Sequence, residues 1–289
     1  MWCFSIDVGG TFTDVVATSP KNEKTFLKVL SSGKVKYSCH KISGHETEVV
    51  EGGNDLPLYT NYNVDVLDSK GEVIQQLVVV EVLENTIVFN ETLNPDAKQL
   101  ELFAGELSPI LAIRQVLKLS RHDEIPKLEL RLGTTRGTNA LLERKGARCA
   151  WVTTKGFGDI LKIGDQTRPN LFSIEQDDAI DLTEAVLEIE ERVSAEGEVL
   201  TPINVNAARE GLQSLLDSGI DSLALSLIHS YKNSIHEELL TKIALELGFS
   251  QVSPSYELCR HIHFLDRSRT VVLDAYLSPV IKDYLNELK

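Results

Sequence analysis

The sequence has few basic residues for its size, and this shortage excludes several classes of partner. Among its 289 residues, 29 are lysine or arginine and 43 are aspartate or glutamate, so the formal net charge is −14. An acidic surface repels nucleic-acid backbones and anionic membranes, and no basic cluster offsets this charge. We therefore expect neither a nucleic acid nor a membrane among the partners of this chain.

Cysteine pairs and long hydrophobic runs are also missing. The four cysteines lie far apart without a CxxC pair, and Cys3 and Cys149 fall in apolar runs, which favours buried free thiols. The longest apolar stretches, near Leu77–Leu83 and Leu223–Ile228, are too short to span a bilayer. The start of the chain, Met1–Asp7, lacks the features of a signal peptide. These absences predict a cytoplasmic protein with reduced thiols.

The first thirty residues predict three short strands. Trp2–Val8 is apolar and alternating, Gly9-Gly10 turns the chain, and Thr11–Ala17 is rich in β-branched residues. A polar stretch then leads to a third strand, Thr25–Leu30. Two strands joined directly by a Gly-Gly turn form an antiparallel hairpin.

The remainder divides into an inserted module and an α/β region. We interpret residues 34–105 as a small β-meander inserted between residues 1–33 and 106–289 of the main domain, because short β-like runs alternate there with turn signals. After it, predicted helices and strands alternate, which indicates a mixed or parallel sheet covered by helices. These elements are a helix capped by Ser108-Pro109, a strand at Leu128–Leu132, a helix at Thr138–Arg144, strands at Cys149–Val152 and Ser222–Ile228, and helices at Ala207–Leu216, after the Ser234/Glu237 capping box, and at Val271–Leu288.

The turn after the first strand carries the most informative motif. Gly9 and Gly10 allow the backbone to approach an anion closely and to direct N–H groups toward it. If Thr11 and Thr13 alternate on one face of the second strand, both hydroxyls could reach the same phosphate.

Acidic residues flank this turn on both sides. Asp7 could hold a Mg²⁺ ion, usually through water, and Asp14 closes the motif. The sequence fits neither the dinucleotide fingerprint nor the P-loop, because its Gly-Gly opens a strand. The alternative interpretation is a plain hairpin with threonine chosen for its β-propensity.

These motifs resemble one family. Asp7–Asp14 is similar to the first phosphate motif of the actin/Hsp70/sugar-kinase superfamily, in the form used by the hydantoinase/5-oxoprolinase family, and Leu132–Gly146 closely resembles that family's signature. The resemblance covers nearly the whole chain, apart from the inserted module, which is similar to an insert in some members. The other matching segments are Thr153–Asp159, Ile163–Phe172, His229–Tyr231 with His236-Glu237, and Arg269–Leu277.

The family signature contains a second candidate loop between a strand and a helix. Gly133 and the hydroxyls of Thr134, Thr135 and Thr138 could bind a nucleotide phosphate or a substrate carboxylate, with Asn139 beside them. In the alternative interpretation the threonines only cap the helix and Asn139 braces the loop.

Arginine and histidine side chains add weaker candidates. Arg168 precedes a proline and could bind a carboxylate bidentately, or it is a surface arginine. His261 and His263 would share one face of a strand, yet no third ligand lies nearby, which favours a structural role over a metal site. His229 ends an apolar strand and fits a core position. The spacing identifies no catalytic residue.

The resemblance implies an α/β fold of the actin/Hsp70/sugar-kinase-like (ribonuclease H-like) type, with a mixed sheet and helices. It implies ATP and Mg²⁺ as cofactors, and ATP-dependent opening of a cyclic amide such as 5-oxoproline or a hydantoin as the activity. Two alternatives are an ATP-dependent ketone carboxylase subunit and a non-catalytic nucleotide-binding assembly lobe. A sugar-kinase type phosphotransferase is disfavoured by the Gly-Thr-Thr loop.

The superfamily binds ATP in a cleft between two lobes, each of which supplies a phosphate hairpin. The sequence contains one Asp-x-Gly-Gly-Thr hairpin. We therefore expect a fragment of a longer protein that carries half of a nucleotide site and binds Mg-ATP weakly by itself. The implied partners are a downstream lobe or a hydantoinase B-type subunit or domain, within an oligomer.

Overall fold

The computed structural model describes residues 1–49, 56–165 and 181–288 and divides the chain into two compact units. Unit 1 holds Met1–Asn139 together with the residues from Glu287 on, and unit 2 holds Ala140–Asn286. Helix α2 (Arg136–Leu142) runs from one unit into the other. No helix within the described ranges is long and apolar enough to cross a membrane.

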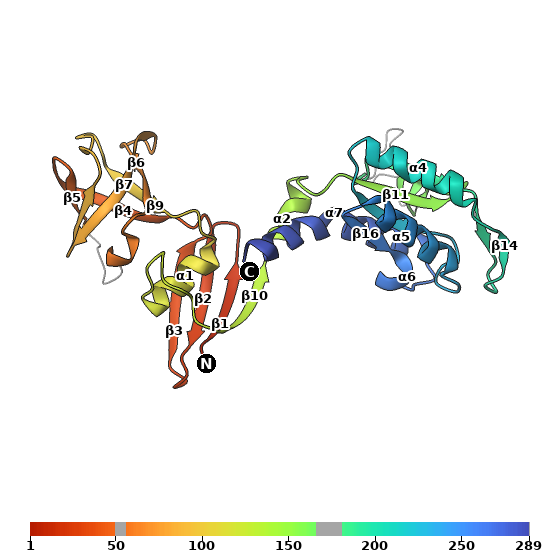
Figure 1. Ribbon diagram of the computed structural model, residues 1–289, viewed down its shortest axis with the longest axis horizontal. Helices are drawn as coiled ribbons and strands as arrows, with labels where there is room; N and C mark the ends of the chain where they lie inside the picture. The colour runs from red at the N-terminus through yellow and green to blue at the C-terminus, as the bar shows by residue number, and fades with distance from the viewer. Residues whose placement is uncertain (50–55, 166–180, 289) are drawn as a thin grey trace, which may run out of the picture. The chain divides into compact units, whose positions relative to one another are not determined.

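Unit 1 contains a mixed four-stranded sheet in the order β10-β1-β2-β3 (Figure 1). The Gly-Gly turn joins β1 (Cys3–Val8) to β2 (Phe12–Thr18) as an antiparallel hairpin, which confirms the sequence prediction. Strand β3 (Lys24–Leu30) pairs antiparallel with β2, and β10 (Glu129–Thr134) pairs parallel with β1.

Helix α1 (Ser108–Leu117) covers one face of this sheet. Alternate residues of β1 and β2 point toward it and are buried, whereas Ser5, Asp7, Phe12 and Asp14 on the other face are exposed. The N-cap of α1 is Leu107, so the prediction that Ser108 caps the helix was wrong by one residue. The Ser108 hydroxyl instead bonds to Thr13 Oγ1 at 2.8 Å.

The inserted segment forms a closed β-barrel in the order β4-β5-β8-β7-β6-β9 (Figure 1). This order differs from a simple meander, because β5 pairs with β8, and β9 pairs with both β4 and β6. Closure removes the two free edges that a meander of the same strands would expose. The strands are β4 (Val35–Ser43), β5 (Glu46–Val49), β6 (Asn63–Leu67), β7 (Val73–Leu83), β8 (Thr86–Phe89) and β9 (Gln99–Phe103), with a 3₁₀ turn at Leu56–Tyr59.

Unit 2 is built on a parallel sheet in the order β12-β11-β15-β16. The strands are β11 (Cys149–Thr154), β12 (Ala185–Ile189), β15 (Ser222–Ser226) and β16 (Gln251–Pro254). The two central strands, β11 and β15, are buried along their whole length, as expected for a parallel sheet covered on both faces.

Helices cover both faces of this sheet. Helices α4 (Val205–Asp217) and α5 (Ile235–Leu247) pack on one face, and α7 (Phe264–Glu287) packs on the other. Helix α7 begins seven residues before the predicted start at Val271. The sequence prediction missed its first turns because the residues buried there include polar ones, Arg267 and Ser268. Short elements complete the unit: α3 (Ile160–Ile163), the hairpin β13 (Arg192–Val193) and β14 (Val199–Thr201), and α6 (Ser255–Leu258).

The predicted histidine pair does not lie on a strand. His261 and His263 occupy the irregular segment just before α7, with ring centroids 5.0 Å apart. Within the described part of the chain, no group of three histidine, cysteine or acidic side chains could hold a metal ion. His229 lies in a turn with φ 61°, and its Nδ1 is 2.7 Å from the carbonyl oxygen of Val193, so this half-buried ring has a hydrogen-bond partner.

Candidate functional site

The Gly-Gly turn of unit 1 is tight and is held by hydrogen bonds within the turn and from Ser31. Gly9 N–H donates to the carbonyl of Phe12 at 3.0 Å, and a Cβ on Gly9 would lie 2.9 Å from that same oxygen, so the position requires glycine. The Ser31 hydroxyl donates to the carbonyl of Gly9 at 2.8 Å, and Ser31 N–H donates to the carbonyl of Thr11 at 2.9 Å. Three hydrogen bonds therefore hold the turn in one shape.

The structure brings this turn beside the second candidate loop. Asp7 and Gly133 are register partners in the parallel pair of β1 and β10, and a Cβ on Gly133 would lie 3.2 Å from Asp7 Oδ1. Just beyond this pair, the N–H of Thr135 donates to the carbonyl of Val8 at 3.1 Å. The two motifs, although far apart in sequence, thus meet where two parallel strands end.

Asn139 reaches the turn from helix α2. Its Nδ2 lies 3.6 Å from the position of a Cβ on Gly10, and its backbone N–H donates to the carbonyl of Thr135. This side chain therefore occupies the space between the loop and the turn. The geometry fits a bracing role and equally places the amide beside any anion on the turn.

Several groups around the turn are open to solvent. The side chains of Asp7, Thr11, Thr135 and Thr138 are exposed. Among the described residues, the backbone N–H groups of Gly10 and Thr11 donate no hydrogen bond. Free N–H groups at a glycine turn are what an anion site requires.

Thr134 has the structural role that the sequence left open. Its Oγ1 accepts a hydrogen bond from the backbone N–H of Arg136 at 3.1 Å, at the start of α2. Its hydroxyl therefore serves the local turn first.

Thr13 differs from the expectation that it shares a ligand with Thr11. Strand β2 starts at Phe12, so Thr11 belongs to the turn and the alternation does not extend to it. Thr13 is fully buried on the α1 face, and its Oγ1 bonds to Ser31 Oγ at 3.0 Å and to Ser108 Oγ at 2.8 Å. Its hydroxyl links the hairpin to α1 and is not available to a phosphate.

Asp14 lies on the same exposed face as Asp7. The two residues are register partners across β1 and β2, so their side chains are neighbours. Lys28 Nζ pairs with Asp14 Oδ1 at 2.9 Å and partly neutralises this acidic pair. The remaining predicted residue, Arg168, lies outside the described residues.

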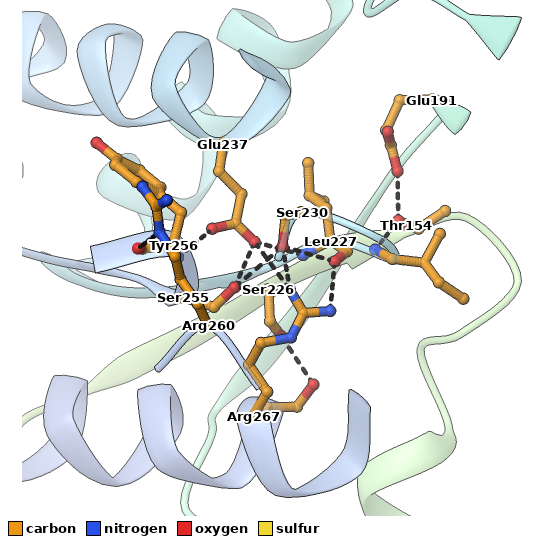
Figure 2. Close-up of polar contacts among 12 residues, drawn as sticks. Thr154, Glu191, Ser226, Leu227, Ser230, Glu237, Ser255, Tyr256, Arg260 and Arg267 are labelled. Atoms are coloured by element: carbon orange, nitrogen blue, oxygen red, sulfur yellow. Dashed lines mark hydrogen bonds and ion pairs between the residues drawn. The ribbon is translucent and has the colours of Figure 1, made fainter. Parts of the chain in front are cut away.

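A second polar cluster lies at the carboxyl edge of the unit 2 sheet, where ligands of open α/β sheets usually bind (Figure 2). At its centre the Glu237 carboxylate is fully buried. It accepts hydrogen bonds from the N–H of Leu227 at 2.8 Å, the Ser255 hydroxyl at 2.7 Å and the N–H of Tyr256 at 2.9 Å. Burial raises the pKa of Glu237, and these hydrogen bonds act in the opposite direction.

Glu237 therefore does not form the predicted capping box with Ser234. The Ser234 hydroxyl donates to the Glu238 carboxylate at 2.5 Å instead, and it accepts no capping hydrogen bond from a backbone N–H of α5. The Ser-x-x-Glu pattern is the same for an exposed cap and for an inward glutamate. Here the hydrogen-bond donors at the ends of β15 and β16 decide the orientation.

Arg267, from α7, is the cationic partner in this cluster. Its guanidinium is fully buried, with Nη1 4.0 Å from Glu237 Oε1 and 3.0 Å from Ser255 Oγ, and with Nη2 2.9 Å from the carbonyl of Leu227. It also contacts the ring of Phe264. Burial lowers the pKa of Arg267, and the nearby Glu237 raises it.

A Thr–Glu–His chain continues the cluster. The Thr154 hydroxyl donates to Glu191 and accepts from the N–H of Ile228, and His236 Nδ1 lies 2.6 Å from Glu191 Oε2. All three side chains are buried. Sequence reasoning missed this cluster, although the adjacent His236-Glu237 pair in the first turn of a helix was a usable signal. Because its members bond mainly to one another, we interpret the cluster as structural: it stabilises the loops that follow the strands.

Comparisons with known proteins show the family of this chain. A family model described as the hydantoinase/oxoprolinase N-terminal region matches residues 86–248, more than half of the chain. The chain belongs to the hydantoinase/oxoprolinase family. It is 40% identical over 217 residues to the 5-oxoprolinase of Saccharomyces cerevisiae, an alignment that covers 63% of this chain and 17% of that protein. The chain thus spans about one sixth of the length of that family member.

Two solved structures share the fold. The ATP-dependent caprolactamase from Pseudomonas jessenii matches with a TM-score of 0.61 and 18% identity, and a nucleotide-free acetone carboxylase matches with a TM-score of 0.59 and 16% identity. Each match covers 99% of this chain and 33% of the other. These similarities show that the mixed α/β architecture recurs in larger enzymes.

Proposed function

We propose that this chain is the nucleotide-phosphate-binding part of an ATP-dependent cyclic-amide hydrolase that opens 5-oxoproline or a hydantoin. The observation that carries the proposal is the meeting of the Gly9-Gly10 turn with the 133–139 loop, at the carboxyl ends of the parallel strands β1 and β10. Such strand ends are the usual ligand position in open α/β sheets. The 40% identity to a 5-oxoprolinase supports the substrate class.

The turn has the groups that a phosphate requires. The backbone N–H groups of Gly10 and Thr11 and the exposed Thr11 hydroxyl would bind its oxygens, since none of the described residues accepts from those two N–H groups. The absence of a side chain on Gly10 leaves the approach open. Exposed Thr135 and Thr138, with Asn139, would bind a second anionic group, which is a nucleotide phosphate or the carboxylate of the substrate.

The acidic pair on the exposed face fits a hydrated Mg²⁺ ion. Asp7 and Asp14 are cross-strand neighbours. Mg²⁺ prefers oxygen ligands and keeps several of its own water molecules, so one or two carboxylates are enough to hold it. Asp7 would hold the ion through water, with Asp14 shared between the ion and Lys28. When bound, ATP supplies the phosphoryl group that activates the ring amide. The residues of this chain position the phosphates and offset their charge.

In this proposal the chain forms one actin-like lobe and completes its site with a downstream lobe or a hydantoinase B-type subunit. A single phosphate turn gives half of a nucleotide cleft. We therefore expect residues 1–289 alone to bind Mg-ATP weakly or undetectably in a direct titration. Tight binding by this chain alone would contradict the half-site.

The test uses the complete natural polypeptide that contains these residues, with its B-type subunit if that is separate; we call this the complete enzyme. ADP release is measured with Mg-ATP, with and without 5-oxoproline, and then with hydantoins. Asp7→Asn should lower the stimulated rate about 100-fold or more, because it removes a charge aimed at the cofactor. Glu23→Gln, an equivalent change at an exposed acid of the same sheet region, should leave the rate unchanged.

A second candidate is an ATP-dependent ketone carboxylase subunit. The fold similarity to acetone carboxylase favours it, and the same phosphate turn would serve. ADP release that requires a ketone and bicarbonate, and that ignores cyclic amides, would establish this alternative. ATP binding without turnover in the presence of either substrate would indicate a nucleotide-binding assembly lobe instead.

A further inference from the structure

A hollow of about 410 Å³ lies in unit 2, and its lining residues are different from those of the Gly-Gly turn and of the Glu237 cluster. Helices α2, α3 and α7 and the segment before β12 supply its walls. Its volume falls within the range of small-molecule sites, which is roughly 300–1,000 Å³. The side chains that line it therefore decide which ligand it fits.

The walls of this hollow are mainly apolar. Leu141, Leu161 and Leu182 line it, are partly buried and pack on the core cluster around Trp151. Leu273, on α7, also lines it and is 38% exposed. An apolar ligand displaces water from such a surface favourably, because burial of apolar area drives association. The walls thus favour a ligand with an apolar body.

Two basic side chains line the same hollow, Arg269 from α7 and Lys162 from α3. Arg269 Nη2 lies 3.3 Å from the position of a Cβ on Gly164, so the glycine at the end of α3 leaves room for the guanidinium. Within the described part of the chain, neither basic side chain forms a hydrogen bond or an ion pair. A guanidinium without a protein partner is available to a carboxylate, which it can bind through two N–H groups.

One acid, Asp181, also lines the hollow, and its carboxylate is already used. Its Oδ1 accepts from the N–H of Thr183 at 2.9 Å and from the Thr183 hydroxyl at 2.7 Å. Two basic side chains therefore stand against one acid that is held by its own turn. This excess of positive charge selects an anionic ligand over a cationic one.

A second hollow of unit 2, of about 340 Å³, differs because its polar groups are occupied. Lys155, which lines it, lies 3.6 Å from Glu190. Glu188 accepts two backbone N–H groups, and Asn204 caps α4. A ligand gains little from groups that already have protein partners, so the hollow beside Arg269 is the better candidate.

We propose that the hollow beside Arg269 is a binding site for a small carboxylic acid with an apolar body. The carboxylate pairs with Arg269 and Lys162, and the apolar body lies against the leucines of the walls. This site goes beyond the proposed function and does not depend on it, because binding of the acid requires neither ATP nor turnover.

Calorimetric titration of the complete enzyme with three matched probes tests this class of ligand. The probes 3-phenylpropanoate, 3-phenylpropan-1-ol and 3-phenylpropylammonium share one apolar body and differ in charge. The carboxylate should bind about 10-fold more tightly than the alcohol, and the ammonium should bind most weakly, because Arg269 and Lys162 attract the first and repel the last. Equal affinities for the three probes, or no binding of the carboxylate, would overturn the proposal.

Variants of the complete enzyme locate the binding. Arg269→Gln should weaken 3-phenylpropanoate about 10-fold and leave the alcohol unchanged, because it removes only the charge-assisted contact. Leu273→Asn should weaken both probes, because it removes apolar wall. Lys242→Gln, at an exposed lysine of α5 on the opposite face of the sheet, should change neither. Full carboxylate affinity in Arg269→Gln would contradict the site, and the probe series on the parent enzyme stands even if a variant folds poorly.

Two sources of such an acid are distinguishable. A hydantoin with an apolar substituent opens to an N-carbamoyl amino acid, which has this chemistry, and an unrelated acid has it as well. If N-carbamoyl-phenylalanine binds about 10-fold more tightly than 3-phenylpropanoate, with the same loss in Arg269→Gln, the occupant is a product of ring opening. Equal affinities of these two acids would support a site for apolar acids in general.

ADP release is measured on the same complete enzyme, so the two proposals can fail separately. Carboxylate binding without ADP release on any cyclic amide would refute the proposed function and leave the site intact. ADP release without carboxylate binding would do the reverse.

Discussion

The strand-end clusters of the two units use similar residues in opposite ways. In unit 2, Glu237, Arg267 and the Thr154–Glu191–His236 chain are buried and bond to one another. In unit 1, the turn after β1 leaves its acidic and hydroxyl side chains exposed and two backbone N–H groups unused among the described residues. Polar groups whose hydrogen bonds are all made within the protein stabilise the fold. Exposed polar groups on a rigid turn remain available to a ligand.

The strongest test of this contrast is the buried cation of unit 2. Arg267→Leu leaves the Glu237 carboxylate buried without its cationic neighbour, which should lower the free energy of unfolding of unit 2 by about 3–5 kcal/mol. Urea unfolding followed by the buried Trp151, in a Trp2→Phe background, reports on this unit. Arg260→Leu, at an exposed arginine of the same region, should change stability little.

If Arg267→Leu unfolds at the same urea concentration as its parent, the cluster does not stabilise unit 2. A double variant with Glu237→Gln should recover part of the loss, because it removes the stranded charge.

The next effect concerns the two glycines of the turn. Gly9→Ala places a Cβ 2.9 Å from the carbonyl oxygen of Phe12, so the hairpin must distort, at a cost of about 1–3 kcal/mol. Gly10→Ala meets only Asn139 Nδ2, at 3.6 Å, and should leave unfolding unchanged while it weakens Mg-ATP binding by the complete enzyme. Equal loss of stability in both variants would remove the distinction between a structural and a ligand-facing glycine.

An intermediate case is the ion cluster at the start of the barrel. Lys34 Nζ lies 2.8 Å from both Asp65 and Glu101. Burial acts to raise the pKa of each carboxyl group, yet the hydrogen bonds from Lys34, with Gln76 at Asp65 and Lys36 at Glu101, outweigh it and lower both pKa values. Groups with a lowered pKa in the folded state stabilise it above their unfolded pKa and lose that contribution as the pH falls.

Unit 1 should therefore lose on the order of 1–2 kcal/mol between pH 6 and pH 3 from this cluster. Urea unfolding at the two pH values measures the change, and Lys34→Met should reduce the difference. A stability of unit 1 that rises toward acid would show that desolvation of the carboxylates dominates instead.

The smallest predicted effect separates Thr13 from Thr11. Thr13→Val deletes a buried hydroxyl that bonds to Ser31 and Ser108, so it should cost about 1 kcal/mol of stability with Mg-ATP binding unchanged. Thr11→Val should do the opposite in the complete enzyme, since Thr11 is exposed in the turn. Calorimetric titration together with thermal unfolding distinguishes them, and loss of nucleotide affinity in Thr13→Val alone would reverse the assignment.

Local features of the fold were predictable, because they depend on neighbouring residues. The Gly9-Gly10 hairpin followed from a turn signal between two alternating runs, and the helix at Ala207–Leu216 followed from its apolar period. The contact of the turn with the 133–139 loop was not derivable from spacing, since parallel pairing of β1 and β10 joins residues more than a hundred positions apart. Family resemblance pointed to both motifs without giving their distance.

Burial of polar residues explains most of the errors. Arg267 and Ser268 interrupted the apolar pattern and hid the start of α7, although both lie in its packed face. The Ser234/Glu237 spacing predicts a cap, and only the partners of Glu237 on other strands turn it inward. Barrel closure also escaped prediction, because pairs such as β4 with β9 depend on long-range register and not on local sequence.

The barrel begins and ends at one point of unit 1. Gly33, with φ 70°, lies so close to Glu106 that a Cβ on the glycine would sit 2.4 Å from the carbonyl oxygen of Glu106. The chain therefore leaves unit 1's sheet after β3 and returns before α1 at two adjacent positions, Gly33 and Glu106. In evolutionary terms, a module attached in this way can be acquired, exchanged or lost in one genetic event while β3 and α1 keep their positions. For protein engineering, the same pair of adjacent connection points is a suitable site for a fused reporter domain.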